Sequence, residues 1–263
     1  IYHVFKSKRL IMSRLMLTFF LSLVFISQNP GFAQEVEEQV KNDKDKVLVF
    51  YKTEGFWHKS IPTGRSFIAD LGEDHDFEVI ATKDADDFNE KNLAKFDLVI
   101  FLSTTGNVLD EKEQEAFKKY IENGGNFFGI HAAADTEYEW PWFGELVGGY
   151  FAGHPEIQEA DIHVNMPEHP AVSHLPKIWT RTDEWYNYKK LNPEMQVLLY
   201  LDENSYEGGT NGEEHPIAWF RETGYGGVSI YTGLGHTIQS YIEPGFKEHI
   251  LQSILYALDK TKN

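Results

Sequence analysis

Four segments of the chain combine histidine, acidic or hydroxyl side chains with glycine or other small residues, and each follows a short apolar stretch. They are residues 53–58, 103–107, 131–135 and 232–237, and three of them contain a histidine, namely His58, His131 and His236. Imidazole can act as a general acid, a general base or a metal ligand near neutral pH. These segments are therefore the first candidates for a functional site. Structural histidines that fall there by chance are the alternative.

His131 stands where an apolar stretch, residues 126–130, runs directly into small residues. In hydrolases a sharp turn from strand to helix presents a serine or cysteine nucleophile, and here the turn would present His131. Asp135 lies four residues further on, so in a helix its carboxylate could share a face with the imidazole and orient it. Alternatively, Asp135 only caps the next turn.

Asp183 and Glu184 form an adjacent pair of carboxylates that could supply a further acid or base. Neighbouring residues of a strand point to opposite faces, so only one of the two can face the site, and we prefer Glu184. The predicted catalytic residues are therefore His131, His236, Asp135 and Glu184.

The same side chains could instead bind a metal. His58, His131 and His236 could converge with Asp135 or Glu184, and such a set would suit Zn²⁺ or another borderline divalent ion. The histidines show no close spacing such as H-E-x-x-H, so the sequence alone commits to no cofactor.

A second group of residues would suit a sugar, because aromatic rings pack against the C–H face of a pyranose and polar groups bond its hydroxyls. The expected substrate-binding residues are Glu54, Trp57, His58, Asn107, Trp185, Tyr186 and Arg221. The alternative is that most of these aromatic side chains fill the core of an irregular segment.

Strands and helices alternate along the segments that would position these residues. Apolar runs at 46–51, 77–81, 98–102 and 126–130 are typical of parallel strands buried on both faces. Residues 110–123 are the clearest helix, with Asp110 as N-cap and Glu113 three residues later. This order predicts a doubly wound, mostly parallel α/β sheet, in which ligands bind at the carboxyl ends of the strands.

The second half of the chain continues less regularly. Residues 135–190 are rich in tryptophan, tyrosine, histidine and proline and are predicted to be an elaborated insertion. Strands are expected at 195–201, 216–220 and 227–231, and a closing helix at 246–258.

The composition excludes several classes of protein. The chain has 263 residues, 24 Lys plus Arg, 41 Asp plus Glu and no cysteine, for a net charge of −17. Without cysteine there is no disulfide, thiolate metal site or cysteine nucleophile. A chain with this much negative charge would repel a phosphate backbone. We therefore expect no nucleic-acid partner.

Residues 1–33 differ from the rest because they contain no acidic residue, and Lys6, Lys8, Arg9 and Arg14 precede an apolar run at 15–26. This pattern predicts a signal peptide cleaved after Ala33, and therefore a periplasmic or secreted protein without membrane contact after cleavage. An uncleaved anchor is the alternative, although the apolar run is short for a membrane span. Residues 34–45 are expected to be a flexible leader and 46–260 a single domain.

Several motifs together resemble the ThuA-like (trehalose utilisation) family. They are the segments 129–135, 143–155, 183–186 and 227–236, and the resemblance covers about residues 46–258. It implies a three-layer α/β/α sandwich, similar to class I glutamine amidotransferases and flavodoxin-like folds. Those amidotransferases carry a cysteine at the turn where this chain has His131, so glutaminase chemistry is excluded.

The resemblance also implies a role in sugar metabolism, with trehalose or oxidised (keto) sugars as associated substrates. We therefore expect an exported protein that acts on a small sugar or keto-glycoside through histidine and carboxylate groups. A sugar-binding or accessory module without catalysis is the alternative, and a domain that contacts a protein partner is a third. A homo-oligomer is compatible with the sequence.

Overall fold

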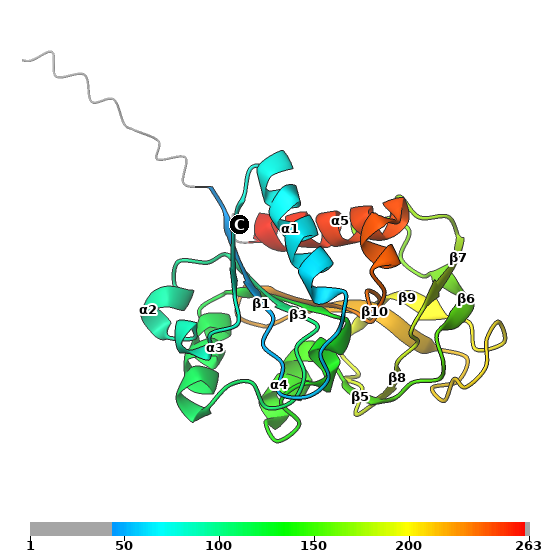
Figure 1. Ribbon diagram of the computed structural model, residues 1–263, viewed down its shortest axis with the longest axis horizontal. Helices are drawn as coiled ribbons and strands as arrows, with labels where there is room; N and C mark the ends of the chain where they lie inside the picture. Colours follow the sequence, from blue (N-terminus) through cyan, green and yellow to red (C-terminus); the bar gives the residue numbers. More distant parts are fainter. Residues whose placement is uncertain (1–43, 261–263) are drawn as a thin grey trace, which may run out of the picture. The chain divides into compact units, whose positions relative to one another are not determined.

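Nine strands form one sheet in the computed structural model, which describes residues 44–260 (Figure 1). The predicted signal peptide and residues 34–43 of the predicted leader lie outside the described residues. The strand order is β2-β1-β3-β4-β11-β10-β9-β6-β7. The first five are parallel and are β2 (Glu78–Thr82), β1 (Lys46–Phe50), β3 (Leu98–Leu102), β4 (Asn126–Ile130) and β11 (Val228–Thr232).

The remaining four strands extend the sheet in antiparallel fashion. They are β10 (His215–Glu222), β9 (Gln196–Leu201), β6 (Gln158–Val164) and β7 (Ile178–Asp183). A separate pair, β5 (Tyr150–Gly153) and β8 (Asn187–Lys189), forms a small second sheet.

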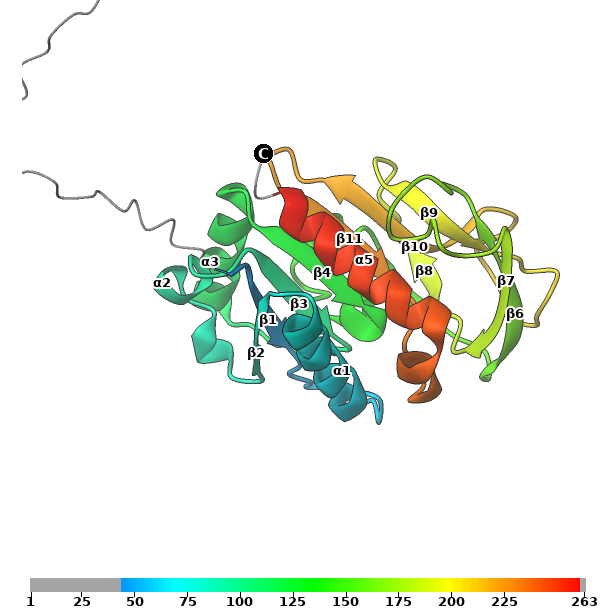
Figure 2. The same ribbon diagram turned by 90° about the horizontal axis from the view of Figure 1, so that it is seen from above.

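Helices cover both faces of the parallel half, which confirms the doubly wound three-layer α/β/α fold. Figures 1 and 2 show α1 (Ile61–Asp74) and α5 (Pro244–Lys260) on one face. Figure 1 places α2 (Glu90–Leu93), α3 (Glu111–Glu122) and α4 (Pro141–Val147) on the other. Three short 3₁₀ turns complete the elements, namely η1 (Ala85–Asp87), η2 (His131–Asp135) and η3 (Gln239–Ile242).

Local sequence signals explain where these elements begin. Helix α3 starts with the predicted capping box, because the Asp110 side chain accepts from the Glu113 backbone while the Glu113 side chain accepts from the Asp110 backbone. Strands β3 and β4 are buried along their whole length, as the continuous apolar runs predict. The predicted strands and helices of the parallel half are confirmed to within one or two residues.

The prediction of an irregular insertion at 135–190 was wrong in one respect, because β6 and β7 belong to the main sheet. In β7 every second residue is buried, so Trp179, Arg181 and Asp183 point inward between exposed neighbours. Such alternation is typical of an antiparallel strand with one solvated face. The continuous apolar runs that mark the parallel strands are absent from β7. Among residues 44–260, no helix is long and apolar enough to cross a bilayer.

Candidate metal centre

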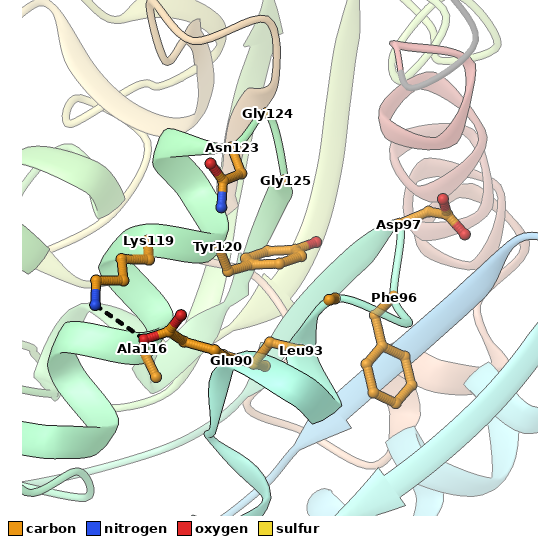
Figure 3. A pocket seen from close by; sticks show the side chains of 11 residues that line it. Glu90, Leu93, Phe96, Asp97, Ala116, Lys119, Tyr120, Asn123, Gly124 and Gly125 are labelled. Atoms are coloured by element: carbon orange, nitrogen blue, oxygen red, sulfur yellow. Dashed lines mark hydrogen bonds and ion pairs between the residues drawn. The ribbon is translucent and has the colours of Figure 1, made fainter.

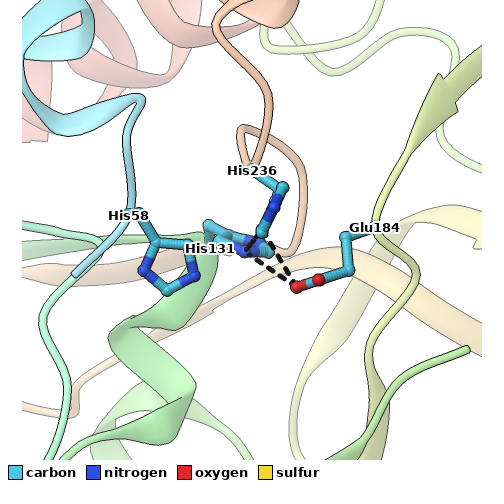
Figure 4. Close-up of side chains that lie close together, drawn as sticks. All are labelled: His58, His131, Glu184 and His236. Carbon is cyan, nitrogen blue, oxygen red and sulfur yellow. Dashed lines mark hydrogen bonds and ion pairs between the residues drawn. The ribbon is translucent and has the colours of Figure 1, made fainter. Parts of the chain in front are cut away.

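Four side chains from four segments face one another beside the carboxyl ends of the central strands (Figure 4). His131 directly follows β4, and His236 lies four residues after the end of β11, the neighbouring strand. His58 comes from the loop after β1, and Glu184 directly follows β7. The topology therefore brings the three predicted histidines and the preferred carboxylate into one cluster.

The cluster is close enough for a single ion to bridge its members. Each residue offers one nitrogen or oxygen atom, and these four atoms lie within 4.8 Å of one another. His236 Nδ1 lies 3.0 Å from Glu184 Oε2 and 3.1 Å from His131 Nε2. The His58 ring centroid is 4.8 Å from that of His131 and 5.1 Å from that of His236.

His131 is held in one orientation by the backbone. It has φ 52°, a left-handed conformation that is uncommon outside glycine. Its Nδ1 lies 2.8 Å from the carbonyl oxygen of Gly233, which can only accept, so Nδ1 carries the hydrogen. Nε2 then faces His236 Nδ1 at 3.1 Å and Glu184 Oε2 at 3.5 Å. With a hydrogen on Nε2 the ring can donate to Glu184, and without it the Nε2 lone pair is available to a metal. This tautomer is the one that a metal-ligating histidine needs.

The predicted role of Asp135 in orienting His131 was wrong. The turn after His131 is a 3₁₀ segment that becomes extended at Thr136, so the two side chains do not stack as in an α-helix. Instead, the Asp135 carboxylate accepts a 2.6 Å hydrogen bond from the Tyr138 hydroxyl. The Gly233 carbonyl takes the orienting role.

His58 is buried without a hydrogen bond to its Nδ1. Its side chain belongs to a residue that is only 3% exposed, and within residues 44–260 Nδ1 has no partner. Burial lowers the pKa of His58 from 6.5 to about 2, and the neighbouring His131 and His236 act in the same direction. His58 is therefore neutral, and none of the residues that the structure describes satisfies its Nδ1.

Glu184 supplies the negative charge of the cluster. Burial alone would raise its pKa, but hydrogen bonds with His131 and His236 hold the pKa of Glu184 well below its usual value. Its other oxygen, Oε1, lies 3.3 Å from His154 Nδ1. An ionised carboxylate and three imidazoles form a set that suits a borderline divalent cation such as Zn²⁺.

The family model described as trehalose utilisation (ThuA) matches residues 46–257. The chain belongs to the ThuA family. Its description supports a carbohydrate-related role in general terms. No curated protein matches this ThuA chain significantly.

Solved structures resemble the ThuA chain over most of its length. A ThuA-like protein of Bacteroides uniformis ATCC 8492 is 26% identical with a TM-score of 0.71, and the match covers 81% of this chain and 91% of that one. A ThuA-like protein of Parabacteroides merdae ATCC 43184 is 19% identical with a TM-score of 0.67, covering 82% and 90%. The cytoplasmic protein STM3548 of Salmonella typhimurium is 12% identical with a TM-score of 0.55, covering 81% and 98%. The last two show the fold alone.

Several predicted substrate-binding residues of the ThuA chain lie at the same edge as the cluster. Trp57 is 46% exposed in the His58 loop. Glu54 is exposed and pairs with Lys52 at 3.3 Å, and Asn107 is exposed in the loop after β3. Tyr186 is buried, with its ring centroid 4.3 Å from that of His131.

Two predicted substrate-binding residues lie elsewhere. Trp185 is fully buried, and its indole nitrogen donates to the Gln158 carbonyl, because alternation turns it away from the side that Glu184 faces. Arg221 pairs with Ser229 near the start of β11, and it donates to the Glu145 carbonyl. Since β10 runs antiparallel to β11, residues late in β10 lie at the opposite edge from the cluster. Both predictions were therefore wrong.

Sequence reasoning missed two residues beside the cluster, Phe151 and Tyr138. The Phe151 ring centroid is 4.3 Å from that of Tyr186, and the Tyr138 hydroxyl lies 3.2 Å from the Phe151 carbonyl as well as near Asp135. The aromatic content of 135–190 was the available signal, but nothing in the sequence shows which of its rings reach the site.

A separate cavity of about 420 Å³ lies between α2 and α3 (Figure 3). Residues just before β3 and β4, such as Asp97 and Gly125, line it, so it opens at the amino ends of these strands. The Lys119–Glu90 ion pair, 2.9 Å long, is part of its lining. No predicted site residue lines this cavity, so we do not assign it a function.

Proposed function

We propose that this ThuA protein binds a divalent metal ion through His58, His131, Glu184 and His236 and uses this centre to act on a small sugar or keto-glycoside. One observation carries the proposal. The four ligand atoms, which come from three imidazoles and one carboxylate on four separate segments, lie within 4.8 Å of one another.

A metal bound there would polarise a sugar carbonyl or hydroxyl, or lower the pKa of a bound water molecule. Glu184 contributes the charge that partly neutralises a divalent ion, and His131 contributes an Nε2 lone pair set by its bond to Gly233. Three imidazoles and one carboxylate leave room for substrate or water if the ion expands its coordination.

Asp135 is the residue that we propose for proton transfer to or from the sugar. Burial raises the pKa of Asp135 above its usual value, although the Tyr138 bond offsets part of that rise. The Tyr138 hydroxyl lies 2.6 Å from Asp135 and 3.2 Å from the Phe151 carbonyl, so it has two acceptors for one hydrogen. Asp135 can therefore remain hydrogen-bonded to Tyr138 in either protonation state, which suits a general acid or base.

Aromatic rings next to the centre support a carbohydrate ligand. Phe56 is 63% exposed, and its ring centroid lies 4.8 Å from that of His58, while Tyr186 contacts His131 from another element. An exposed ring such as that of Phe56 can pack against the C–H face of a pyranose. The family description favours sugars as substrates, and the absence of cysteine excludes a cysteine-dependent glutaminase.

We further propose that the protein acts outside the cytoplasm. The support is the composition of residues 1–33, where basic residues precede an apolar run and the small residues Gly31 and Ala33 occupy the −3 and −1 positions of the expected cleavage site.

A substrate screen tests the function. The purified chain is incubated with a panel of disaccharides and their 3-keto derivatives, in EDTA and after addition of Zn²⁺ or Mn²⁺, and every sugar is followed by mass spectrometry and NMR. We expect conversion of at least one sugar that requires metal and is lost in His131→Ala. Conversion that continues in EDTA would contradict the metal-dependent reaction. Saturable sugar binding without product would favour the non-catalytic sugar-binding module.

A further inference from the structure

Three residues after β11, Gly233–Gly235, contact every other segment that carries a proposed metal ligand. The Gly233 carbonyl accepts from His131 Nδ1 at 2.8 Å. The Gly235 carbonyl accepts from Ser60 Oγ at 3.1 Å, and Ser60 lies two residues after His58. The Gly235 N–H donates to Asp183 Oδ2 at 2.9 Å, and Asp183 directly precedes Glu184. We call the segment Gly233–Gly235 the hub, and His236 directly follows it.

The Asp183 side chain accepts several of the hydrogen bonds that join these segments. It is fully buried, and its Oδ1 accepts from the Glu184 backbone N–H at 3.0 Å. Its Oδ2 accepts from Arg181 at 2.7 Å and from Ser240 at 3.1 Å, besides the Gly235 N–H. One carboxylate thus binds the backbone on both the Glu184 side and the His236 side of the cluster.

The hub has little freedom to move when these bonds are intact. Gly235 has φ +107°, and a Cβ there would lie 3.1 Å from Phe246 and Tyr241 atoms. A Cβ on Gly233 would clash with the Tyr188 hydroxyl. Packing therefore confines the hub on one side, and Asp183 and Ser60 hold it by hydrogen bonds.

We propose that Asp183 and Ser60 are positioning residues of the metal centre, which fix the spacing of its ligands by holding the Gly233–Gly235 backbone. This inference rests on the metal centre of the proposed function. Replacing a group that hydrogen-bonds to a metal ligand commonly changes metal affinity by about 10- to 100-fold. We expect an effect of that order here, because these bonds hold the backbone that carries the ligands. A rigid hub would also keep the four ligand atoms close together before metal binds.

A purely structural role for Asp183 is the competing explanation, because Asp183 also neutralises the buried Arg181. Glu243 offers a matched control, since its carboxylate binds the same arginine at 2.9 Å. The bonds of this carboxylate go to the side chains of Arg181 and Trp179, whereas Asp183 also bonds the backbone N–H groups of Glu184 and Gly235. Ser253 is the control for Ser60, because it too is a buried serine whose hydroxyl donates to a backbone carbonyl, that of His249.

The test compares the purified chain with Asp183→Asn, Ser60→Ala, Glu243→Gln and Ser253→Ala. Affinity for Zn²⁺ is measured by competition with a chromophoric chelator, the visible spectrum of the Co²⁺ form reports ligand geometry, and thermal unfolding of the metal-free form verifies folding. We expect Asp183→Asn to weaken Zn²⁺ binding by about 10- to 100-fold and Ser60→Ala by about 10-fold. The two controls should remain within about 2-fold of the unchanged chain.

Imidazole nitrogen NMR signals of the metal-free protein give a second measurement that does not depend on metal. Asp183→Asn should shift the signals of His236, and Glu243→Gln should leave them unchanged. Unshifted signals, or equal loss of affinity in the controls, would overturn the positioning role. An unchanged chain that binds no Zn²⁺ but shows the Asp183-dependent NMR shift would instead overturn the metal centre alone.

Discussion

At the scale of single residues, His58 differs from His131 and Glu184 in how its polar atoms are hydrogen-bonded. His131 is bonded to Gly233 and Glu184 to the imidazoles around it, whereas His58 Nδ1 is buried without a partner among residues 44–260. A protein under selection for stability alone would place an apolar side chain there. A residue that breaks a local rule in this way is expected at a functional site.

Replacing His58 by leucine should separate stability from function. In the metal-free protein we expect His58→Leu to raise the free energy of unfolding by about 1 kcal/mol, because an unsatisfied buried nitrogen is removed. Affinity for Zn²⁺ should fall by at least about 100-fold, because one ligand is lost. Urea denaturation in EDTA and a Zn²⁺ titration measure the two effects. A variant that is less stable and still binds Zn²⁺ normally would show that His58 is a packing residue.

Asp135 should behave differently, because the ligand set formed within residues 44–260 does not include it. Asp135→Asn should retain Zn²⁺ affinity and lose sugar conversion by about 100-fold, the usual size of a general acid or base effect. Tyr138→Phe removes the hydroxyl bonded to Asp135 and should give a smaller loss. The measurement is the initial rate on a sugar that the unchanged protein converts. Equal rates in Asp135→Asn would refute the proton-transfer role.

At the scale of the elements, the parallel half of the sheet could be predicted well and the antiparallel half only in outline. Strands such as β3 and β4 are buried on both faces and therefore read as continuous apolar runs. Their order along the chain was enough to expect that His58, His131 and His236 share one edge. Strands β6 and β7 alternate and lie within an aromatic-rich segment, so their membership of the main sheet depends on pairing that no local pattern reveals.

Helix α5 is joined to the sheet by a buried histidine. His249 is fully buried, and its two ring nitrogens contact the Ala171 carbonyl at 2.8 Å and the Thr232 hydroxyl at 3.1 Å. Burial lowers the pKa of His249 to about 4. The folded state therefore binds fewer protons than the unfolded state, whose histidine has its pKa near 6.5, so this stability is complete above about pH 6.5 and decreases as the pH falls toward 4.

The pH dependence of unfolding tests this role of His249. Between pH 6.5 and about 4.5, His249 should contribute a decrease of about 1.4 kcal/mol in unfolding free energy for each unit of acidification. In His249→Gln that contribution disappears, so the variant should show a shallower slope even though its stability at pH 7 is lower. Urea unfolding curves at pH 7.0, 6.0 and 5.0 give both slopes. Identical slopes would mean that His249 titrates alike in both states.

At the scale of the whole molecule, the site joins the two halves of the sheet. The three histidines follow strands of the parallel half, and Glu184 follows β7 at the far end of the antiparallel extension. The sequence could predict the histidines from strand order. Alternation indicated only that one of Asp183 and Glu184 faces the site, without showing which of the two. The sequence could not show that the turn after His131 is a 3₁₀ segment, which is why the role given to Asp135 was wrong, nor that Trp185 and Arg221 point elsewhere.

Metal stoichiometry tests the account most directly. The purified chain is stripped with EDTA, dialysed against limiting free Zn²⁺, and assayed for bound metal by elemental analysis beside the double variant His131→Ala/His236→Ala, with circular dichroism as the check of folding. The account predicts one tightly bound ion per chain and none in the folded double variant. Absence of bound metal in the unchanged chain, or the same metal content in both proteins, would contradict it.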